Sequence, residues 1–153
     1  MAGRGSRRWL VGGMALWLAA SGAMAQNAAD VRRELNELRT RMETLFLREA
    51  WSEIEEAASR VIEIADTDER RARGFADRSL ANLGGMRPRQ ALVDIERAIE
   101  LDPAKAEWLA RRGEVYWTLN RRDEARRDYE AALEKDANDF TAKQGLARMG
   151  IRR

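Results

Sequence analysis

The sequence predicts an all-α fold made of stacked antiparallel helix pairs, and three observations carry that prediction. The stretch 89–102 is repeated by the stretch 123–136 at a constant offset of 34 residues, as when Ala91 pairs with Ala125 (125 minus 91). Apolar residues recur at steps of three and four, the period of an amphipathic helix. No segment alternates with period two, so we expect no strand. A fixed period in this range indicates units that bury their apolar faces against one another.

The composition removes most routes to catalysis. The 153 residues suffice for one domain and contain no Cys and no His. Disulfides, thiolate nucleophiles, Cys/His metal sites and His-based triads are therefore excluded. The three lysines have no Ser nearby in the sequence, and we expect no acid in an apolar pocket that would raise its pKa. We predict no catalytic residue, no metal site and no cofactor, and hence no enzyme.

The first 25 residues resemble a secretory signal peptide. Three arginines precede an apolar run at 10–20, and Ala23-Met24-Ala25 forms a small-x-small cleavage site. We expect cleavage after Ala25, a mature start at Gln26 and a periplasmic location. The apolar run is shorter than the roughly 20 residues that span a bilayer, so we expect no stable membrane insertion. The adjacent Arg7 and Arg8 leave Sec and twin-arginine export both open.

Removal of that segment changes the charge balance. It holds three of the 28 basic residues and no acid, which leaves 25 basic against 26 acidic residues. The charges of the remaining chain are mixed in sign along the expected helices, and no stripe of basic and aromatic residues stands out. We therefore expect no nucleic-acid partner.

The first expected helix of the mature chain, 27–47, carries an apolar stripe from Val31 to Leu45. Its start is marked by Asp30, and the stripe recurs at steps of four and three. Two interpretations remain: the helix docks on its neighbour, or it forms a coiled coil between copies of the chain. The stripe covers about two heptads where a coiled coil wants three or four, which favours docking. The second expected helix is 51–64.

The later elements follow from their end signals. The charged stretch 66–73 is expected to be a turn, and a helix at 74–83 is expected to end at the Gly84–Gly85 pair. Pro88 suits the first turn of the next helix, which Asp102-Pro103 ends. The helix at 105–119 is expected to end in a left-handed Asn120, the next, 123–135, to be capped by Asp123, and the last to run from 140 to 149.

The repeat resembles the tetratricopeptide repeat (TPR) family, whose units are helix pairs of 34 residues. The matches in order are Leu109, Gly113, Tyr116, Ala125, Tyr129 and Ala132 in one unit, and Phe75, Ser79, Ala91, Ile95, Ala98 and Pro103 in the unit before it. The resemblance implies a right-handed superhelical stack, a TPR-like α-solenoid, of about three repeats plus a C-terminal capping helix.

The units are expected at 35–71, 72–105 and 106–139, between an N-terminal extension at 26–34 and a cap and tail at 140–153. The first unit is degenerate, because its best alignment with the second needs a spacing of 37 residues. Asn82 stands where the family has an aromatic residue, and Ala137 where it has Pro. Arg78 and Arg112 stand where Leu is common; we expect their stems to pack while the guanidinium groups reach water.

In the family, the first helices of the pairs line a concave groove that takes peptides or helices of partner proteins. Carried onto this sequence, the groove would be lined by Arg39, Glu43, Phe46, Ala76, Asp77, Leu80, Leu83, Arg111, Glu114, Trp117 and Thr118. An apolar row of one residue per repeat (Phe46, Leu83, Trp117) suggests an anchor site; equally, aromatics at this spacing can be core.

One subgroup of the family clamps a C-terminal carboxylate with Lys and Asn. Arg39, Glu43 and Asp77 stand at those places, so we do not carry that activity over. The function that the sequence favours is an exported adaptor or scaffold that binds another protein of the cell envelope. The alternative is a self-associating structural protein that uses the stripe from Val31 to Leu45.

Overall fold

The computed structural model describes the backbone of residues 8–151 and the side chains of residues 26–151. Its helices are α1 (Arg8–Leu47), α2 (Trp51–Ile64), α3 (Asp68–Gly84), α4 (Pro88–Leu101), α5 (Ala106–Thr118), α6 (Arg122–Lys135) and α7 (Phe140–Arg148). The described part of the chain has no strand. The all-α stack of helix pairs is therefore confirmed.

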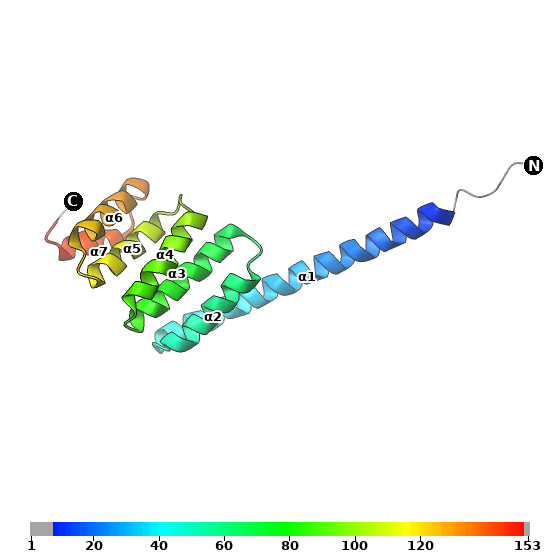
Figure 1. The fold of residues 1–153 in the computed structure, drawn as a ribbon, viewed down its shortest axis with the longest axis horizontal. Helices are drawn as coiled ribbons and strands as arrows, with labels where there is room; N and C mark the ends of the chain where they lie inside the picture. Colours follow the sequence, from blue (N-terminus) through cyan, green and yellow to red (C-terminus); the bar gives the residue numbers. More distant parts are fainter. Residues whose placement is uncertain (1–7, 152–153) are drawn as a thin grey trace, which may run out of the picture.

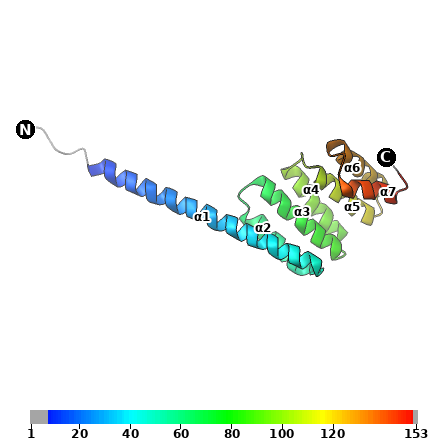
Figure 2. The ribbon, with the colours of Figure 1, turned by 180° about the vertical axis from the view of Figure 1, so that it is seen from behind.

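The helices stack in chain order as the pairs α1–α2, α3–α4 and α5–α6, and α7 closes the end by packing on α5 and α6 (Figure 1). Seen from either side, the N-terminal half of α1 extends away from all the other helices, and only its C-terminal half lies against α2 (Figure 2). Among the described residues, no helix combines the length and apolar character needed to cross a bilayer.

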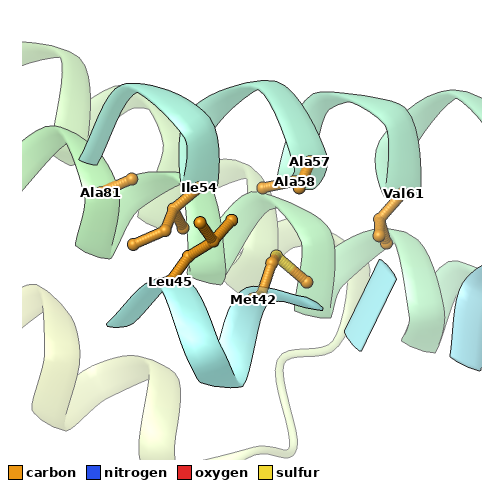
Figure 3. Packing of buried hydrophobic residues seen from close by; sticks show 7 residues of the cluster. All are labelled: Met42, Leu45, Ile54, Ala57, Ala58, Val61 and Ala81. Atoms are coloured by element: carbon orange, nitrogen blue, oxygen red, sulfur yellow. The ribbon is translucent and has the colours of Figure 1, made fainter. Parts of the chain in front are cut away.

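Helix α1 is longer than expected, because it begins at Arg8 rather than near residue 27 and runs without a break to Leu47. Its expected apolar stripe packs within the chain. Met42 and Leu45 are buried against Ile54 of α2, and their cluster also includes Ala81 of α3 (Figure 3). Of the two interpretations of the stripe, the short stripe favoured docking on the neighbouring helix, and the stripe does dock there.

Small residues allow the helices of the stack to approach closely. Three buried clusters follow one another along the chain, and alanines form much of each of them. The fully buried large side chains fill the space that the alanines leave: Trp108, Tyr129, Ile54, Ile95, Leu146 and Val115. Such alternation of large and small side chains is what close packing between helices requires.

Two helix starts differ from expectation. The charged stretch after Ala65 is not a turn: the Thr67 hydroxyl accepts a hydrogen bond from the Arg70 amide at 3.2 Å, and α3 begins at Asp68. The acids Asp68 and Glu69 then lie in the first turn, where they favour a helix. Asp123 is no cap, because α6 already begins at Arg122 and Asp123 sits in its first turn.

The first helix of every pair, and α7, end in the same left-handed turn. The positive φ angles are 52° at Glu49, 60° at Met86, 59° at Asn120 and 77° at Gly150. In each case the next amide bonds back five residues, as from Arg87 to Asn82 at 2.8 Å. Asn120 is thus left-handed as expected. After α3 the left-handed residue is Met86 rather than a glycine, whereas Gly84 makes room for the Trp51 ring.

We expect Met86→Gly to stabilise the protein by about 0.5–1 kcal/mol, because a side chain with Cβ is strained in the left-handed region and glycine is not. The side chain is 83 % exposed, so little packing is lost. Chemical denaturation followed by circular dichroism measures the change. Asn120→Gly is the control and should gain less, since Asn tolerates this conformation. A loss of stability in Met86→Gly would contradict the strain argument.

The side chains of Arg78 and Arg112 are 28 and 25 % exposed, and the guanidinium group of each forms a two-pronged ion pair with a buried carboxylate. Arg112 donates to the two oxygens of Asp128 at 2.7 and 2.9 Å, and Arg78 to those of Asp94 at 3.0 and 2.6 Å. The two carboxylates are 5 and 6 % exposed and stand 34 residues apart (128 minus 94). These pairs tie the two helices of a repeat together.

Asn82 has a place in one of these pairs. Its amide, 4 % exposed, donates to Asp94 at 3.0 Å, so Asp94 is held by two donor groups where Asp128 is held by one. The polar residue that departs from the family pattern thus satisfies a buried carboxylate. In the first unit the position equivalent to Asp94 is Ala57, and Arg41 lies 3.9 Å from an exposed Glu53. The degenerate unit therefore lacks the buried ion pair.

Candidate functional site

The first helices of the three pairs line a groove of about 620 Å³. Its wall comes from α1, from Val61 of α2, from the first ten residues of α3, from the loop before α5 and from the start of α5. The lining residues are Leu35, Asn36, Arg39, Met42, Glu43, Phe46, Val61, Glu69, Arg70, Arg73, Asp77, Asp102, Lys105 and Trp108. Apolar side chains and charged groups of both signs therefore face one cavity, a composition suited to binding.

Four of the residues expected at a groove meet there: Arg39, Glu43, Phe46 and Asp77. Arg39 and Glu43 lie 3.6 Å apart on adjacent turns of α1. Phe46 is half-buried, packs on the first core cluster and meets the Trp51 ring edge-on at 6.3 Å. Arg111 stands behind the cavity wall, where it donates to Glu107 at 2.7 Å and to the Ala76 carbonyl at 3.4 Å.

The remaining expected residues lie toward the other end of the helices. Leu83 packs on the second core cluster, and Leu80 is 36 % exposed. Glu114 accepts from the Tyr129 hydroxyl at 2.7 Å and pairs with Arg148 of α7. Trp117 is half-buried between the guanidinium groups of Arg122 and Arg148, 3.4 and 5.2 Å from its ring centre. Thr118 bonds the Glu114 carbonyl.

Trp108, Arg73 and Lys105 also line the groove, and they were not expected there from the sequence. On α3 the lining residues Glu69, Arg70, Arg73 and Asp77 recur at steps of three and four, and this face starts two turns before the expected Ala76. The periodicity of a helix reveals which face is shared. It does not reveal how far along the helix axis the neighbouring helices separate and leave a cavity.

Asp77 is the most unusual charged group in the groove. It is 9 % exposed, no hydrogen bond reaches its carboxylate from the described residues, and its nearest cation, Arg111, stands 3.8 Å away. Burial raises the pKa of Asp77, against the opposing effect of the nearby Arg111 and Arg73. The expectation that no acid has a raised pKa is therefore wrong at Asp77. The charged residues around Asp77 in the sequence gave no indication that it would be buried.

Trp108 lies in the same groove wall as Asp77, and its indole N–H lacks a hydrogen-bond acceptor among the described residues. The side chain is 1 % exposed. Arg73 and Arg111 stack on the ring at 5.2 and 5.7 Å, and Arg111 also faces Asp77. The Trp108 nitrogen is sealed from solvent, whereas Asp77, whose side chain is 12 % exposed, forms an ion pair with Arg111. A buried donor without an acceptor is rare in folded proteins.

We expect Asp77→Asn to raise the melting temperature at neutral pH. A carboxyl whose folded pKa is raised destabilises the fold above that pKa, and the effect vanishes below the unfolded value of 3.8, where both states are protonated. Asparagine removes the charge and keeps the shape. Thermal unfolding as a function of pH should show a gain that shrinks toward pH 3.8, with the exposed Asp123→Asn as control. A loss of stability at neutral pH would mean that the ion pair with Arg111 outweighs burial.

The groups that line the groove can form hydrogen bonds, ion pairs and apolar contacts with a ligand. Within the described residues, no cluster of three or more acidic side chains could hold a metal ion. Asp77 is accompanied in the groove by arginines and by a neutral indole, and the chain has no His or Cys to act with it. The site presents a hollow in which apolar side chains are mixed with charged groups of both signs.

Comparison with known proteins gives the repeat its family. The model described as tetratricopeptide repeat matches residues 106–139, the third of the units derived from the 34-residue period. A curated relative, the DnaJ homolog subfamily C member 7 homolog of Schizosaccharomyces pombe, is 29 % identical over 120 residues, which are 78 % of this chain. The match spans only 25 % of the length of that relative.

Solved structures with the same fold are TPR domains. The second TPR domain of human RPAP3, in complex with the HSP70 peptide SGPTIEEVD, is 23 % identical with a TM-score of 0.67, covering 80 % of this chain and 99 % of that one. The TPR2B domain of yeast Sti1, in a complex with pHsp70, is 25 % identical with a TM-score of 0.63, covering 76 and 89 %. The fold of this chain is thus that of TPR domains.

Proposed function

We propose that this chain, whose residues 106–139 form a tetratricopeptide repeat within a stack of helix pairs, is an adaptor that binds an extended segment of another protein in the groove between α1, α3 and α5. The observation that carries the proposal is the groove itself, a hollow of about 620 Å³ lined by apolar side chains and by charged groups of both signs. The TPR domains of RPAP3 and Sti1 have been solved in complex with chaperone peptides, which supports a protein partner.

An extended segment suits these groups better than a helix does. The main-chain amides and carbonyls inside a helix already bond one another, so a docked helix presents side chains alone. An extended segment presents unpaired amides and carbonyls at each residue, and the charged side chains of the groove wall can bond to them.

Photocrosslinking in the cells that make the protein tests the adaptor function. Benzoylphenylalanine in place of Arg39, in the groove, should give one dominant protein adduct. The same group in place of Val93, which is 61 % exposed on α4 outside the groove, is the matched control and should give none. Adducts from the Val93 position alone would place the partner on the other face. The absence of adducts from both positions would remove the adaptor function.

We further propose that the protein acts in the cell envelope after export, on the basis of the signal-like sequence at residues 1–25. The intact mass of the protein recovered from its own cells tests this. A chain that begins at Gln26 in the periplasmic fraction is the expected result. A full-length chain in the cytoplasmic fraction would remove the export proposal and leave the binding function to be judged on the crosslinks.

A further inference from the structure

The turn between α1 and α2 is built from residues that favour a continuous helix. The end of α1 and the turn are formed by Leu47, Arg48, Glu49 and Ala50, and all four residue types are among the strongest helix formers. Glu49 nevertheless adopts the left-handed conformation, with a φ angle of 52°. Of the residues with a Cβ, only Asn and Asp adopt it routinely, so Glu49 is strained. The local sequence preference and the folded turn therefore conflict.

The equivalent turns of the other two pairs show no such conflict. After α3 come a glycine and, as the first residue of α4, Pro88. In a continuous helix Pro88 would lack the hydrogen bond to the Gly84 carbonyl and would clash with it. After α5 the left-handed residue is Asn120, which tolerates that conformation. Of the three turns, the one after α1 alone lacks Gly, Pro and Asn, so it is the one that can straighten into a helix.

The interface between α1 and α2 also differs from that of the second pair. Met42 of α1 packs against Ile54 of α2 (Figure 3). The second pair has Ser79 and Ala91 at these positions (79 minus 42 and 91 minus 54 are both 37), and the Ser79 hydroxyl donates to the Ala91 carbonyl at 2.8 Å. Among the described residues, apolar contacts and exposed ion pairs alone join α1 to α2. No buried polar contact has to break for α1 to leave.

Every contact that α1 loses on straightening can be remade with a second copy of the chain. In that arrangement α1 of one copy lies on α2 of the other, with Met42 again against Ile54 and Phe46 again beside the Trp51 ring. The backbone bonds of the turn, such as that from the Ala50 amide to the Leu45 carbonyl at 3.1 Å, are replaced by those of a continuous helix. The packing is conserved, and the strain at residue 49 is relieved in both copies.

We propose that two copies of this chain exchange α1 through the hinge at residues 47–50 and form a two-fold symmetric dimer. In the dimer, α1 and α2 of each copy form one helix, and the two long helices lie antiparallel. Short hinges under strain favour such an exchange. Each groove is then completed by the other copy, since one chain supplies Arg39, Glu43 and Phe46 and the other supplies Asp77. The inference does not depend on what the groove binds and therefore stands apart from the proposed function.

Cross-linking between two single-cysteine variants tests the exchange, because the chain itself has no Cys. Arg41→Cys on α1 and Glu53→Cys on α2 replace side chains that lie 3.9 Å apart. The two variants, one of them labelled with nitrogen-15, are unfolded together, refolded at high protein concentration and treated with a short bismaleimide. We expect a covalent dimer with one copy of each variant. Either variant alone is the control and should give none, because its two cysteines would be separated by about 12 residues of helix, or about 18 Å.

Substitutions of Glu49 locate the exchange at the hinge. Analytical ultracentrifugation of samples refolded over a range of concentrations should show a monomer and a dimer for the wild type. Glu49→Gly suits the left-handed turn and weakens the continuous helix, so we expect the dissociation constant of the dimer to rise at least about tenfold, with two hinges contributing. Glu49→Ala, which removes the charge and keeps the Cβ, should dimerise like the wild type, and so should Asn120→Gly. Circular dichroism confirms that each variant is folded.

Three results would overturn the proposal. The first is a wild-type protein that remains a monomer after refolding at its highest soluble concentration. The second is a dimer that gives no cross-link between Arg41→Cys and Glu53→Cys, because the copies would then associate through another surface. The third is a dimer that Glu49→Ala weakens as much as Glu49→Gly does, because the charge of residue 49, rather than the strain, would then be its cause.

Discussion

Arg112→Met is expected to destabilise the protein by about 3–5 kcal/mol, because it breaks a buried ion pair by removing one partner. Methionine replaces the stem of the arginine but leaves Asp128, 6 % exposed, without the one side chain that donates to it among the described residues. An uncompensated buried charge is strongly destabilising, because the carboxylate has neither water nor a partner. Denaturant unfolding followed by circular dichroism measures the loss.

The second repeat provides an internal comparison. Arg78→Met should cost less than Arg112→Met, because Asp94 keeps the amide of Asn82 as a donor at 3.0 Å. In the double variant Arg112→Met/Asp128→Leu most of the stability should return, since an apolar pair of similar volume often replaces a buried ion pair without loss. The exposed Arg126, 3.2 Å from Glu130, is the control, and Arg126→Met should change stability by less than about 1 kcal/mol.

If Arg112→Met costs no more than Arg126→Met, the pair contributes nothing beyond a surface ion pair. If the double variant is as unstable as the single one, the loss arises from the packing of the arginine stem rather than from the orphaned carboxylate. Either result would contradict the role assigned to these two ion pairs in joining the helices of a repeat.

Gly113→Ala and Gly145→Ala are expected to cost about 2 kcal/mol each. Tyr129 of α6 is fully buried between α5 and α7, and a Cβ added at Gly113 or at Gly145 would stand 2.5 Å from a ring carbon. Overpacking of this kind destabilises a protein by about 1–3 kcal/mol. The better helix propensity of Ala offsets at most about 1 kcal/mol of that loss. Thermal and denaturant unfolding measure the result.

Removal of the ring tests the cause. In a protein that already carries Tyr129→Leu, Gly113→Ala should reduce the stability much less than it does in the wild type. The stability changes caused by substitutions at contacting residues do not add. Gly85→Ala is the control, because the nearest atoms to an added Cβ there are the Ala81 carbonyl oxygen at 3.2 Å and the Arg87 side chain at 3.4 Å. A loss at Gly113 that persists without the ring would show that the ring is not what excludes the side chain.

The fold was largely predictable because it depends on local patterns that recur. The 34-residue offset identified the helix pairs, and α2 begins and ends at the expected residues. The errors fall where one signal can be interpreted in two ways. The stretch Asp66–Arg73 looks like a charged turn, yet Thr67 followed by two acids is also the start of a helix, and the cap that decides between them is a contact in space.

The groove was only partly predictable. The cavity is lined by four residues that the sequence suggested for a groove, Arg39, Glu43, Phe46 and Asp77, whereas Trp108 was not named at all. An apolar residue at the start of a helix looks like core, and Trp108 is indeed buried. Its significance comes from an indole N–H without an acceptor, which only the full set of its neighbours can reveal.

By itself, the sequence determined the repeat, the all-α class, the left-handed Asn120 and the absence of His and Cys chemistry, because each of these depends on residue type and spacing along the chain. Only the tertiary structure decided that Arg112 meets Asp128, that Asp77 lies nine-tenths buried without a hydrogen bond, and where the groove opens. The physical reason is that burial, and with it the strength of a charge and the demand for a partner, is a property of the atoms that surround a group rather than of its place in the chain.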